Sequence, residues 1–233
     1  MSGVLPMRPL LFVLWLGVPL VSRLTIAENP PLRIQPPRIL YISREFWKPG
    51  HEAELNRIEA EAARVCIGLG VPHPYLGIES LTGPNEVWYI NEFTSTEEVK
   101  QVTETYSKRP ELLAAMNRFA QQRREFQSQE NIEVTATYRP ELSRGPEWVM
   151  GENRFLVIAL TKGNPHNDGT VFESQDGLRF IVTAAETRAE ASAKLSAAGP
   201  DAKIFAVRPE FSMPAAQWVA NDPSFWDRKV AKK

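Results

Sequence analysis

Three histidines, His51, His73 and His166, are the side chains best suited to proton transfer or metal binding near neutral pH. Each stands alone in its stretch, whereas zinc and iron sites usually show paired ligands at short spacing, such as His-x-x-x-His. We therefore expect no metal site. His51 begins a predicted helix beside acidic residues, and it is either a surface residue or a base at the mouth of a pocket.

Other motifs of known chemistry are missing from the sequence. It has no glycine-rich nucleotide loop and no Gly-x-Ser-x-Gly turn of the α/β-hydrolase kind, and we expect no cofactor. The single cysteine, Cys66, cannot form an intramolecular disulfide. It lies in an apolar helical stretch without basic neighbours, which is typical of a buried, unreactive thiol.

The polar side of the predicted strands carries the remaining candidates. Residues 132–139 alternate strictly, with apolar side chains on one side and Glu, Thr, Thr and Arg on the other. If two sheets face each other, such polar residues would point into the space between them, where charges must be paired or ligand-bound. The candidate ligand pocket consists of Arg44, Trp88, Glu92, Glu133, Thr135, Thr137 and Arg139. The alternative is a sheet face open to solvent, which fits the same alternation.

Hydrophobic periodicity predicts the elements that must position these residues. β-branched and aromatic runs predict strands, and apolar residues at spacings of three and four predict helices. The first half of the chain, 38–143, then reads as strands at 38–47, 75–81, 86–93 and 132–139, with helices at 51–70 and 95–126, the second interrupted near Pro110. The order β-α-β-β-α-β is that of a ferredoxin-like unit.

The second half, 154–212, reads as a shortened copy with a loop in place of its first helix. Its predicted strands lie at 155–161, 170–174, 178–183 and 202–208, and its helix at 186–198. Two local repeats support duplication. Glu79-Ser80 matches Glu173-Ser174, and Tyr-Arg-Pro-Glu-Leu-Ser at 138–143 matches Val-Arg-Pro-Glu-Phe-Ser at 207–212.

The chain ends predict processing and a terminal helix. The apolar run 10–21, with Arg8 before it and Thr25 and Ala27 after it, is typical of a signal peptide covering 1–27. Because that run is short for a membrane span, cleavage is favoured over a retained anchor. A proline-rich linker follows at 28–37. Residues 213–233 form a C-terminal helix or tail.

Composition narrows the partners. Cleavage after residue 27 would remove two arginines and no acids, so the net charge of −1 would become −3. A weakly acidic body has no excess of cations to neutralise phosphates, which excludes nucleic acid as a partner by composition. We expect an exported protein, periplasmic or extracellular, without a membrane span after cleavage. A small-molecule ligand and a homodimer are both compatible with the sequence.

The first half resembles the dimeric α+β barrel superfamily, above all at the strand-to-helix corner 46–54 (Phe-Trp-Lys-Pro-Gly-His-Glu-Ala-Glu). Within it, the antibiotic-biosynthesis-monooxygenase-like and NIPSNAP-like domains are the most similar. The resemblance covers 38–140 well and 154–211 in outline. It implies an α+β fold of tandem ferredoxin-like halves, with antiparallel sheets packed face to face as a pseudo-dimeric barrel and helices outside. No residue matches a catalytic set of those families.

Three functions stay open at this point. The first is an exported, non-catalytic module that binds a small molecule or a partner. The second, implied by the resemblance, is a small cofactor-free oxygenase or isomerase in which Arg139, Glu92 and His51 orient and polarise the substrate. The third is an envelope-associated structural or assembly protein that docks through Trp218, Phe225 and Trp226.

Overall fold

The computed structural model describes residues 36–163 and 168–226. These residues belong to one compact unit, Ile34–Lys233. The predicted signal peptide at 1–27 lies outside the described residues, as does the predicted linker at 28–37 except for its last two prolines.

The first half contains the predicted elements in the predicted order. They are β1 (Ile39–Phe46), α1 (Glu52–Gly68), β2 (Leu76–Ser80), β3 (Glu86–Phe93), α2 (Thr96–Ser107), α3 (Pro110–Arg124) and β4 (Ile132–Tyr138). The Ser95 hydroxyl accepts a hydrogen bond from the Glu98 backbone N–H at 3.2 Å and caps α2. Pro110 occupies the first turn of α3, where its missing N–H costs nothing, so the interrupted helix becomes two.

The described residues of the second half repeat the pattern without a counterpart of α1. Its elements are β5 (Phe155–Thr161), β6 (Thr170–Ser174), β7 (Arg179–Ala185), α4 (Arg188–Ala198) and β8 (Lys203–Val207), followed by the short helices η1 (Pro209–Phe211), α5 (Ala216–Asn221) and α6 (Pro223–Trp226). Thr187 caps α4 by accepting a hydrogen bond from the Glu190 N–H at 3.1 Å.

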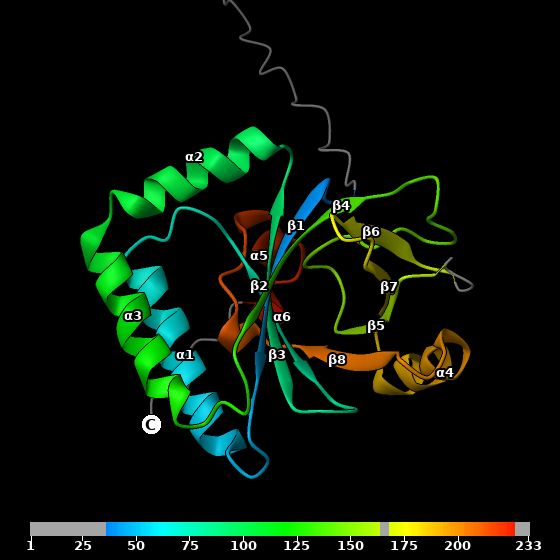
Figure 1. Ribbon diagram of the computed structural model, residues 1–233, viewed down its shortest axis with the longest axis horizontal. Helices are drawn as coiled ribbons and strands as arrows, with labels where there is room; N and C mark the ends of the chain where they lie inside the picture. The colour runs from blue at the N-terminus through cyan, green and yellow to red at the C-terminus, as the bar shows by residue number, and fades with distance from the viewer. Residues whose placement is uncertain (1–35, 164–167, 227–233) are drawn as a thin grey trace, which may run out of the picture. The chain divides into compact units, whose positions relative to one another are not determined.

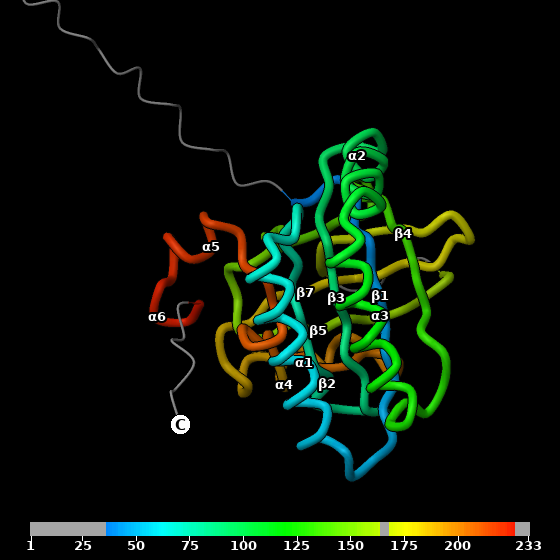
Figure 2. The backbone as a smooth tube through the Cα atoms, turned by 90° about the vertical axis from the view of Figure 1, so that its left-hand side faces the viewer, coloured from blue at the N-terminus to red at the C-terminus, as the bar shows by residue number. Residues whose placement is uncertain are grey.

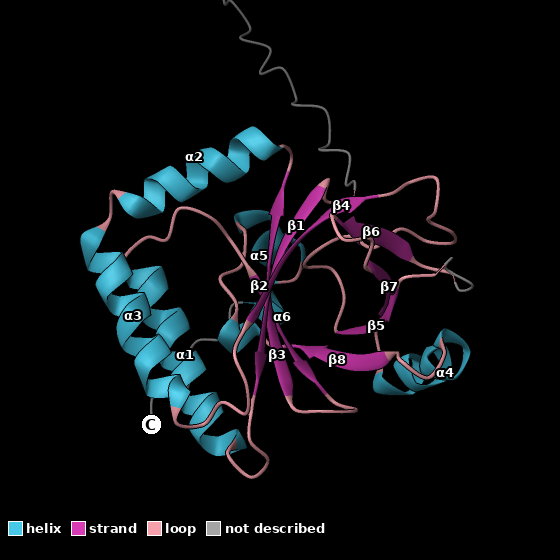
Figure 3. Cartoon of the chain, viewed as in Figure 1, coloured by secondary structure: helices cyan, strands magenta, loops and turns pink. Residues whose placement is uncertain are grey.

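The eight strands form one closed antiparallel barrel in the order β1-β3-β2-β8-β5-β7-β6-β4. The two halves meet at two seams, where β2 pairs with β8 and β4 pairs with β6. Helices α1, α2 and α3 lie outside one side of the barrel and α4 outside the other (Figure 1, Figure 3). The fold is therefore the predicted α+β fold, with two ferredoxin-like halves around a shared interior.

Helices α1 and α3 pack against each other over the outer face of the first half (Figure 2). Ile58 and Ala62 on α1 and Phe119 on α3 form a buried cluster between them. Helix α2 buries none of its side chains and extends away from this layer (Figure 1). The sheet and the α1–α3 pair thus enclose a second buried layer outside the barrel.

Side chains fill the interior of the barrel. Alternate residues of each strand point inward, and they include large apolar groups with almost no exposure, such as Ile42, Trp88, Phe172, Phe180 and Phe205. Trp88 contacts both Phe205 and Phe180, with ring centroids 4.7 and 6.1 Å apart. Each such side chain contributes about 1.5–3 kcal/mol on burial. The space between the halves is the hydrophobic core.

The C-terminal segment packs onto this core where β8 ends. Trp218 and Trp226 are buried and belong to the same apolar cluster as the barrel interior. The Trp226 indole donates to the Gly151 carbonyl at 3.1 Å. A Cβ on Gly151, whose φ is +87°, would lie 2.3 Å from the Trp218 ring. The expected docking patch of Trp218, Phe225 and Trp226 is therefore wrong, because both tryptophans are buried inside the chain itself.

The repeated hexamers lie at the two seams and make equivalent contacts there. Arg139 forms an ion pair with Glu173 across the β4–β6 seam, and Arg208 forms one with Glu79 across the β2–β8 seam. Each arginine of a hexamer thus pairs with a glutamate of the opposite half, and that glutamate belongs to one of the two matched Glu-Ser pairs. The two repeats are one recurring interaction, related by an approximate twofold axis.

The serines of the hexamers complete the equivalence. Ser143 Oγ accepts from the Val171 N–H and Ser212 Oγ from the Gly77 N–H, both at 2.9 Å. Each hydroxyl also donates to the carbonyl of its own motif's arginine, at 2.9 and 2.7 Å. A Cβ on Gly77 would lie 2.8 Å from Phe211, so the larger aromatic residue of one hexamer requires glycine opposite it.

The seams differ in burial, which gives a matched test. Ser212 is 1% exposed, whereas Ser143 is half-buried. Ser212→Ala leaves the buried Gly77 N–H unpaired, whereas the Arg208 carbonyl still accepts from the Phe211 N–H, and we expect it to lower the free energy of unfolding by about 1–3 kcal/mol. Ser143→Ala should cost less, because water can replace the lost hydroxyl. Urea denaturation of both variants measures this; an equal or reversed order would contradict the role of burial at the seams.

Candidate functional site

Three groups of polar residues lie near the end of the sheet where β1 ends and β3 begins. The first is inside the barrel. Arg44 donates to Glu86 Oε2 from Nη2 at 2.9 Å, and the Trp88 indole donates to the same oxygen at 2.7 Å. Lys203 on β8 contacts the other oxygen of Glu86. The Arg44 guanidinium also lies 4.8 Å from the Trp88 ring centroid.

This inner cluster is electrostatically satisfied. Burial alone would raise the pKa of Glu86, but hydrogen bonds from Lys203, Arg44 and Trp88 hold it below its usual range. The negative charge of Glu86 is therefore compensated by donors of the chain itself. The cluster lies inside the barrel at the end of the sheet where β1 ends, and its carboxylate is fully engaged by neighbouring donors.

The second group lies outside the barrel, between the sheet and helices α1 and α3. Arg123 on α3 contacts Glu45 Oε1 at 2.7 Å and Glu59 Oε1 at 2.8 Å. The Tyr89 hydroxyl donates to the other oxygen of Glu59. Both carboxylates are 2% exposed, and Glu45 Oε2 has no hydrogen-bond partner among the described residues.

One guanidinium thus faces two buried carboxylates. Burial raises the pKa of Glu45 to about 7, against the opposing attraction of Arg123, and the nearby Glu59 raises it further. Burial also raises the pKa of Glu59. Because ionising both acids would leave an uncompensated buried negative charge, the outer cluster retains a proton near neutral pH.

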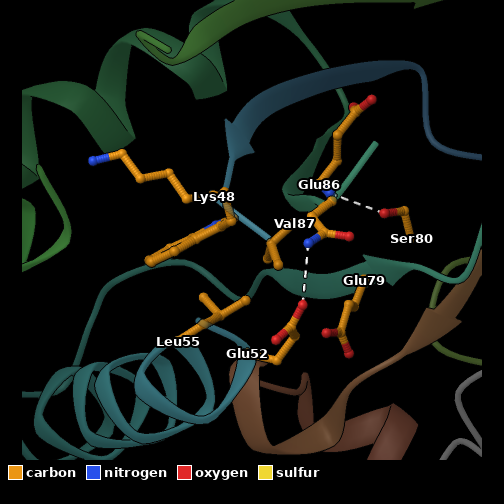
Figure 4. Close-up of a pocket in the computed structure, with 9 residues that line it drawn as sticks. Lys48, Glu52, Leu55, Glu79, Ser80, Glu86 and Val87 are labelled. Atoms are coloured by element: carbon orange, nitrogen blue, oxygen red, sulfur yellow. Dashed lines mark hydrogen bonds between the residues drawn. The ribbon is translucent and has the colours of Figure 1, made fainter. Parts of the chain in front are cut away.

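The third group lines a pocket at the strand-to-helix corner, with a cavity volume of about 110 Å³. Helix α1 forms one wall and the β2–β3 hairpin another (Figure 4). The lining residues are Trp47, Lys48, Glu52, Leu55, Glu79, Ser80, Asn85, Glu86 and Val87. The side chain of Glu86 belongs to the inner cluster, and its backbone N–H donates to Ser80 Oγ at 2.9 Å.

The corner pocket combines an apolar floor with an ionised carboxylate. Leu55 and Val87 are fully buried neighbours of Trp47. Backbone N–H groups and the Asn85 amide, which donates at 3.2 Å, lower the pKa of Glu52, so it is ionised at neutral pH. The buried Trp47 Nε1 has no partner among the described residues. That nitrogen is closed off from solvent, so it does not face the cavity, and the pocket can accept hydrogen bonds and attract positive charge through Glu52.

The seven residues predicted to line a pocket lie on two different faces of the sheet. Arg44 and Trp88 point into the barrel and meet in the inner cluster. Glu92 is on the same face of β3 but pairs in register with Leu40, near the other end of β1. Burial, followed by repulsion from Glu98, raises the pKa of Glu92 to about 7.

The other four residues lie on the opposite face. In the register of β1 and β4, Arg44 lies opposite Ile132, so the apolar side of β4 faces inward. Glu133, Thr135 and Thr137 point outward and are exposed. Arg139 lies at the β4–β6 seam, bound to Glu173. The set does not line one space, because the alternation of β4 places its apolar side in the core.

The three catalytic candidates do not converge. Glu92 and Arg139 lie toward the end of the sheet where β1 begins, whereas His51 follows the end of β1 and caps α1 without a side-chain hydrogen bond. His51 is instead 5.2 Å from the Phe126 ring and 3.9 Å from Glu54. No described group of His, Cys, Asp and Glu residues is arranged to hold a metal ion.

Sequence reasoning missed the residues that the fold brings together. Glu45, Glu59 and Arg123 come from a strand and two helices, separated by up to 78 positions, and no local motif joins them. One signal of the outer cluster was present in the sequence. Glu45 and Trp47 are two positions apart, so the charged Glu45 shares the outward face of β1 and its extension with a large apolar side chain. Cys66 is buried as expected, and burial raises its pKa. No described helix is long and apolar enough to span a membrane.

Comparison with solved structures finds similar chains at very low sequence identity. A candidate monooxygenase of Fusobacterium nucleatum aligns over 77% of this chain and 94% of its own, with 8% identity and a TM-score of 0.45. A candidate monooxygenase of Lactobacillus acidophilus aligns over 74% of this chain and 93% of its own, with 8% identity and a TM-score of 0.39. A chlorite dismutase mutant of Candidatus Nitrospira defluvii aligns over 76% of this chain and 93% of its own, with 8% identity and a TM-score of 0.37. No family model and no curated protein matches the sequence.

The outer cluster predicts a specific pH dependence of stability. The pKa of Glu45 is raised in the folded state from about 4.5 to about 7. Its contribution is therefore fully present below pH 4.5 and is lost as the pH rises through 7. We expect wild-type protein to lose about 1 kcal/mol of unfolding free energy between pH 6 and 8.5 relative to Glu45→Gln, which cannot ionise.

Urea denaturation across this pH range measures the difference. Glu104→Gln, on the exposed face of α2, is the matched control and should keep the wild-type profile. Parallel profiles for wild type and Glu45→Gln would show that Glu45 does not hold the proton.

Proposed function

We propose that this chain is a small-molecule-binding module whose site is the corner pocket between α1 and the β2–β3 hairpin. The observation that carries the proposal is the contrast between the two candidate spaces. The barrel interior is occupied by aromatic and aliphatic side chains, and its buried Glu86 is paired within the chain. The corner pocket holds an ionised carboxylate beside an apolar floor.

Ligand sites usually combine an apolar lining with a few polar groups that fix orientation. The corner pocket has this make-up, and rigid elements support it. Trp47 is held by a backbone hydrogen bond to the Asn85 carbonyl at 2.9 Å, and Lys48 by one to the Phe126 carbonyl at 2.9 Å. The walls are therefore preorganised, which reduces the entropy that binding must overcome.

A catalytic function has less support. The acid groups whose pKa lies near 7, Glu45 and Glu92, lie in separate parts of the molecule, and neither lines the corner pocket. Likeness in fold does not carry an activity over to this chain. The proposal places the binding module outside the cytoplasm, on the strength of the apolar N-terminal run and the small residues that follow it.

The test is an NMR screen of full-length ¹⁵N-labelled protein with a set of small polar fragments. The chain has six tryptophans, so its indole N–H signals can be resolved individually, and Trp47→Phe assigns the one of interest. Fragments that bind should shift the Trp47 indole signal and leave that of Trp218, near the end of β8, in place. A screen whose hits move only other signals would overturn the proposal.

A further inference from the structure

We propose that the mouth of the barrel where β1 ends binds the carboxylate group of a small organic acid through Arg44 and Lys203. This site goes beyond the proposed function, because neither residue lines the corner pocket. Three features of the inner cluster carry the inference: an unused edge of the Arg44 guanidinium, an excess of positive charge, and an opening to solvent at the start of β4.

Arg44 uses only one edge of its guanidinium within the chain. Nε and Nη2 both donate to Glu86 Oε2, at 3.3 and 2.9 Å. Nη1 has no hydrogen-bond partner among the described residues, and solvent still reaches it. The free edge consists of Nη1 and the second N–H of Nη2, which are two parallel donors. Such a fork matches the two oxygens of a carboxylate.

The guanidinium is held in place by the chain itself. Arg44 is 9% exposed, and its guanidinium carbon lies 4.8 Å from the Trp88 ring centroid and 5.1 Å from that of Phe46. These two aromatic contacts and the hydrogen bonds to Glu86 fix the orientation of the free edge. Binding therefore costs little side-chain entropy at Arg44.

The inner cluster carries one positive charge more than it compensates. Arg44 and Lys203 both contact Glu86, and neither forms another ion pair among the described residues. The pKa of Glu86 is held below its usual range, so two cations share one carboxylate at neutral pH. Because Arg44 is mostly buried, water solvates the excess charge only in part, which favours a bound counter-ion. A single carboxylate would neutralise the cluster.

The barrel is open to solvent at the level of Arg44. In the register of β1 and β4, Ile132 lies opposite Arg44, on the inward side of β4. Ile132 is 40% exposed, whereas Ala136, four residues further along the same side, is fully buried. Solvent therefore reaches the first inward position of β4 and not the core below it. The apolar part of an acid bound at Arg44 would lie against Ile132.

Three probes separate the shape of the ligand from its charge. Butyrate has the carboxylate and an apolar chain, butyramide has the same shape without the charge, and chloride has the charge without paired oxygens. Sodium butyrate, butyramide and sodium chloride are each titrated into full-length ¹⁵N-labelled protein in a chloride-free buffer.

The signal to follow is the Trp88 indole N–H, which donates to Glu86 Oε2 at 2.7 Å. Butyrate should shift it and bind at least tenfold more tightly than the other two, because each of them lacks at least one charge-assisted hydrogen bond. The indole signal of Trp218, near the end of β8, should stay in place.

Two variants divide the roles of the fork and the charge. Arg44→Lys keeps the charge and removes the fork, whereas Lys203→Gln keeps the fork and removes the excess charge. Each should weaken butyrate binding about tenfold. Circular dichroism checks the fold, and Lys203→Gln, at a partly exposed side chain, keeps the test available if Arg44→Lys fails to fold.

Lys162→Gln is the matched control. Lys162 is an exposed cation that follows β5 at the same end of the barrel, and it pairs with Asp176 at 3.0 Å. Its removal lowers the net charge as much as Lys203→Gln does and should leave butyrate binding unchanged.

Four results would overturn the inference. Chloride binding as tightly as butyrate would mean an adventitious ion only, and butyramide binding as tightly would mean that the charge plays no part. Wild-type affinity in a folded Arg44→Lys or Lys203→Gln variant would remove the proposed residues. A Trp88 signal that butyrate leaves unmoved would remove the site. None of these results bears on the corner pocket, whose own test follows Trp47.

Discussion

Closure of the barrel at the two seams is the constraint on which the rest of the structure depends. Neither half has enough strands to enclose a core, and each leaves two sheet edges unpaired. The edges of β2 and β4 in the first half are satisfied by β8 and β6 of the second. Open edges would cost backbone hydrogen bonds and invite aggregation. The pairing of the halves removes all of these edges at once.

Closure also decides where polar groups can lie. Once the inward side of every strand becomes core, a charge on that side must be paired within the chain, as Arg44, Glu86 and Lys203 are. The helices covering the first half create a second buried layer, where Arg123 serves both Glu45 and Glu59. The corner pocket lies beside these two layers, and there the ionised Glu52 borders a cavity.

The asymmetry of the halves bears on how the pocket is built. One wall is helix α1, which has no counterpart among the described residues between β5 and β6 of the second half. Its other wall is the β2–β3 hairpin, held at the seam by Arg208 and Glu79. The site therefore depends on a feature of one half and on a contact made by both.

The sequence by itself determined the order of the elements and the duplication. Periodicity depends on neighbours along the chain, so the β-α-β-β-α-β order of the first half and the break at Pro110 were predictable. The matched hexamers at 138–143 and 207–212 could be recognised from the sequence alone. Their meaning as two equivalent seams, with Arg139 bound to Glu173 and Arg208 to Glu79, required the structure.

Only the tertiary structure decided the faces and the site. Alternation in β4 shows that two sides differ, but it does not say which side is buried until strand register is known, and Glu133, Thr135 and Thr137 proved to be outside. The corner pocket joins residues of the turn after β1, of α1 and of the β2–β3 hairpin, which no spacing rule relates. Side chains distant in sequence share a site only when the fold places them together, and that information lies in packing.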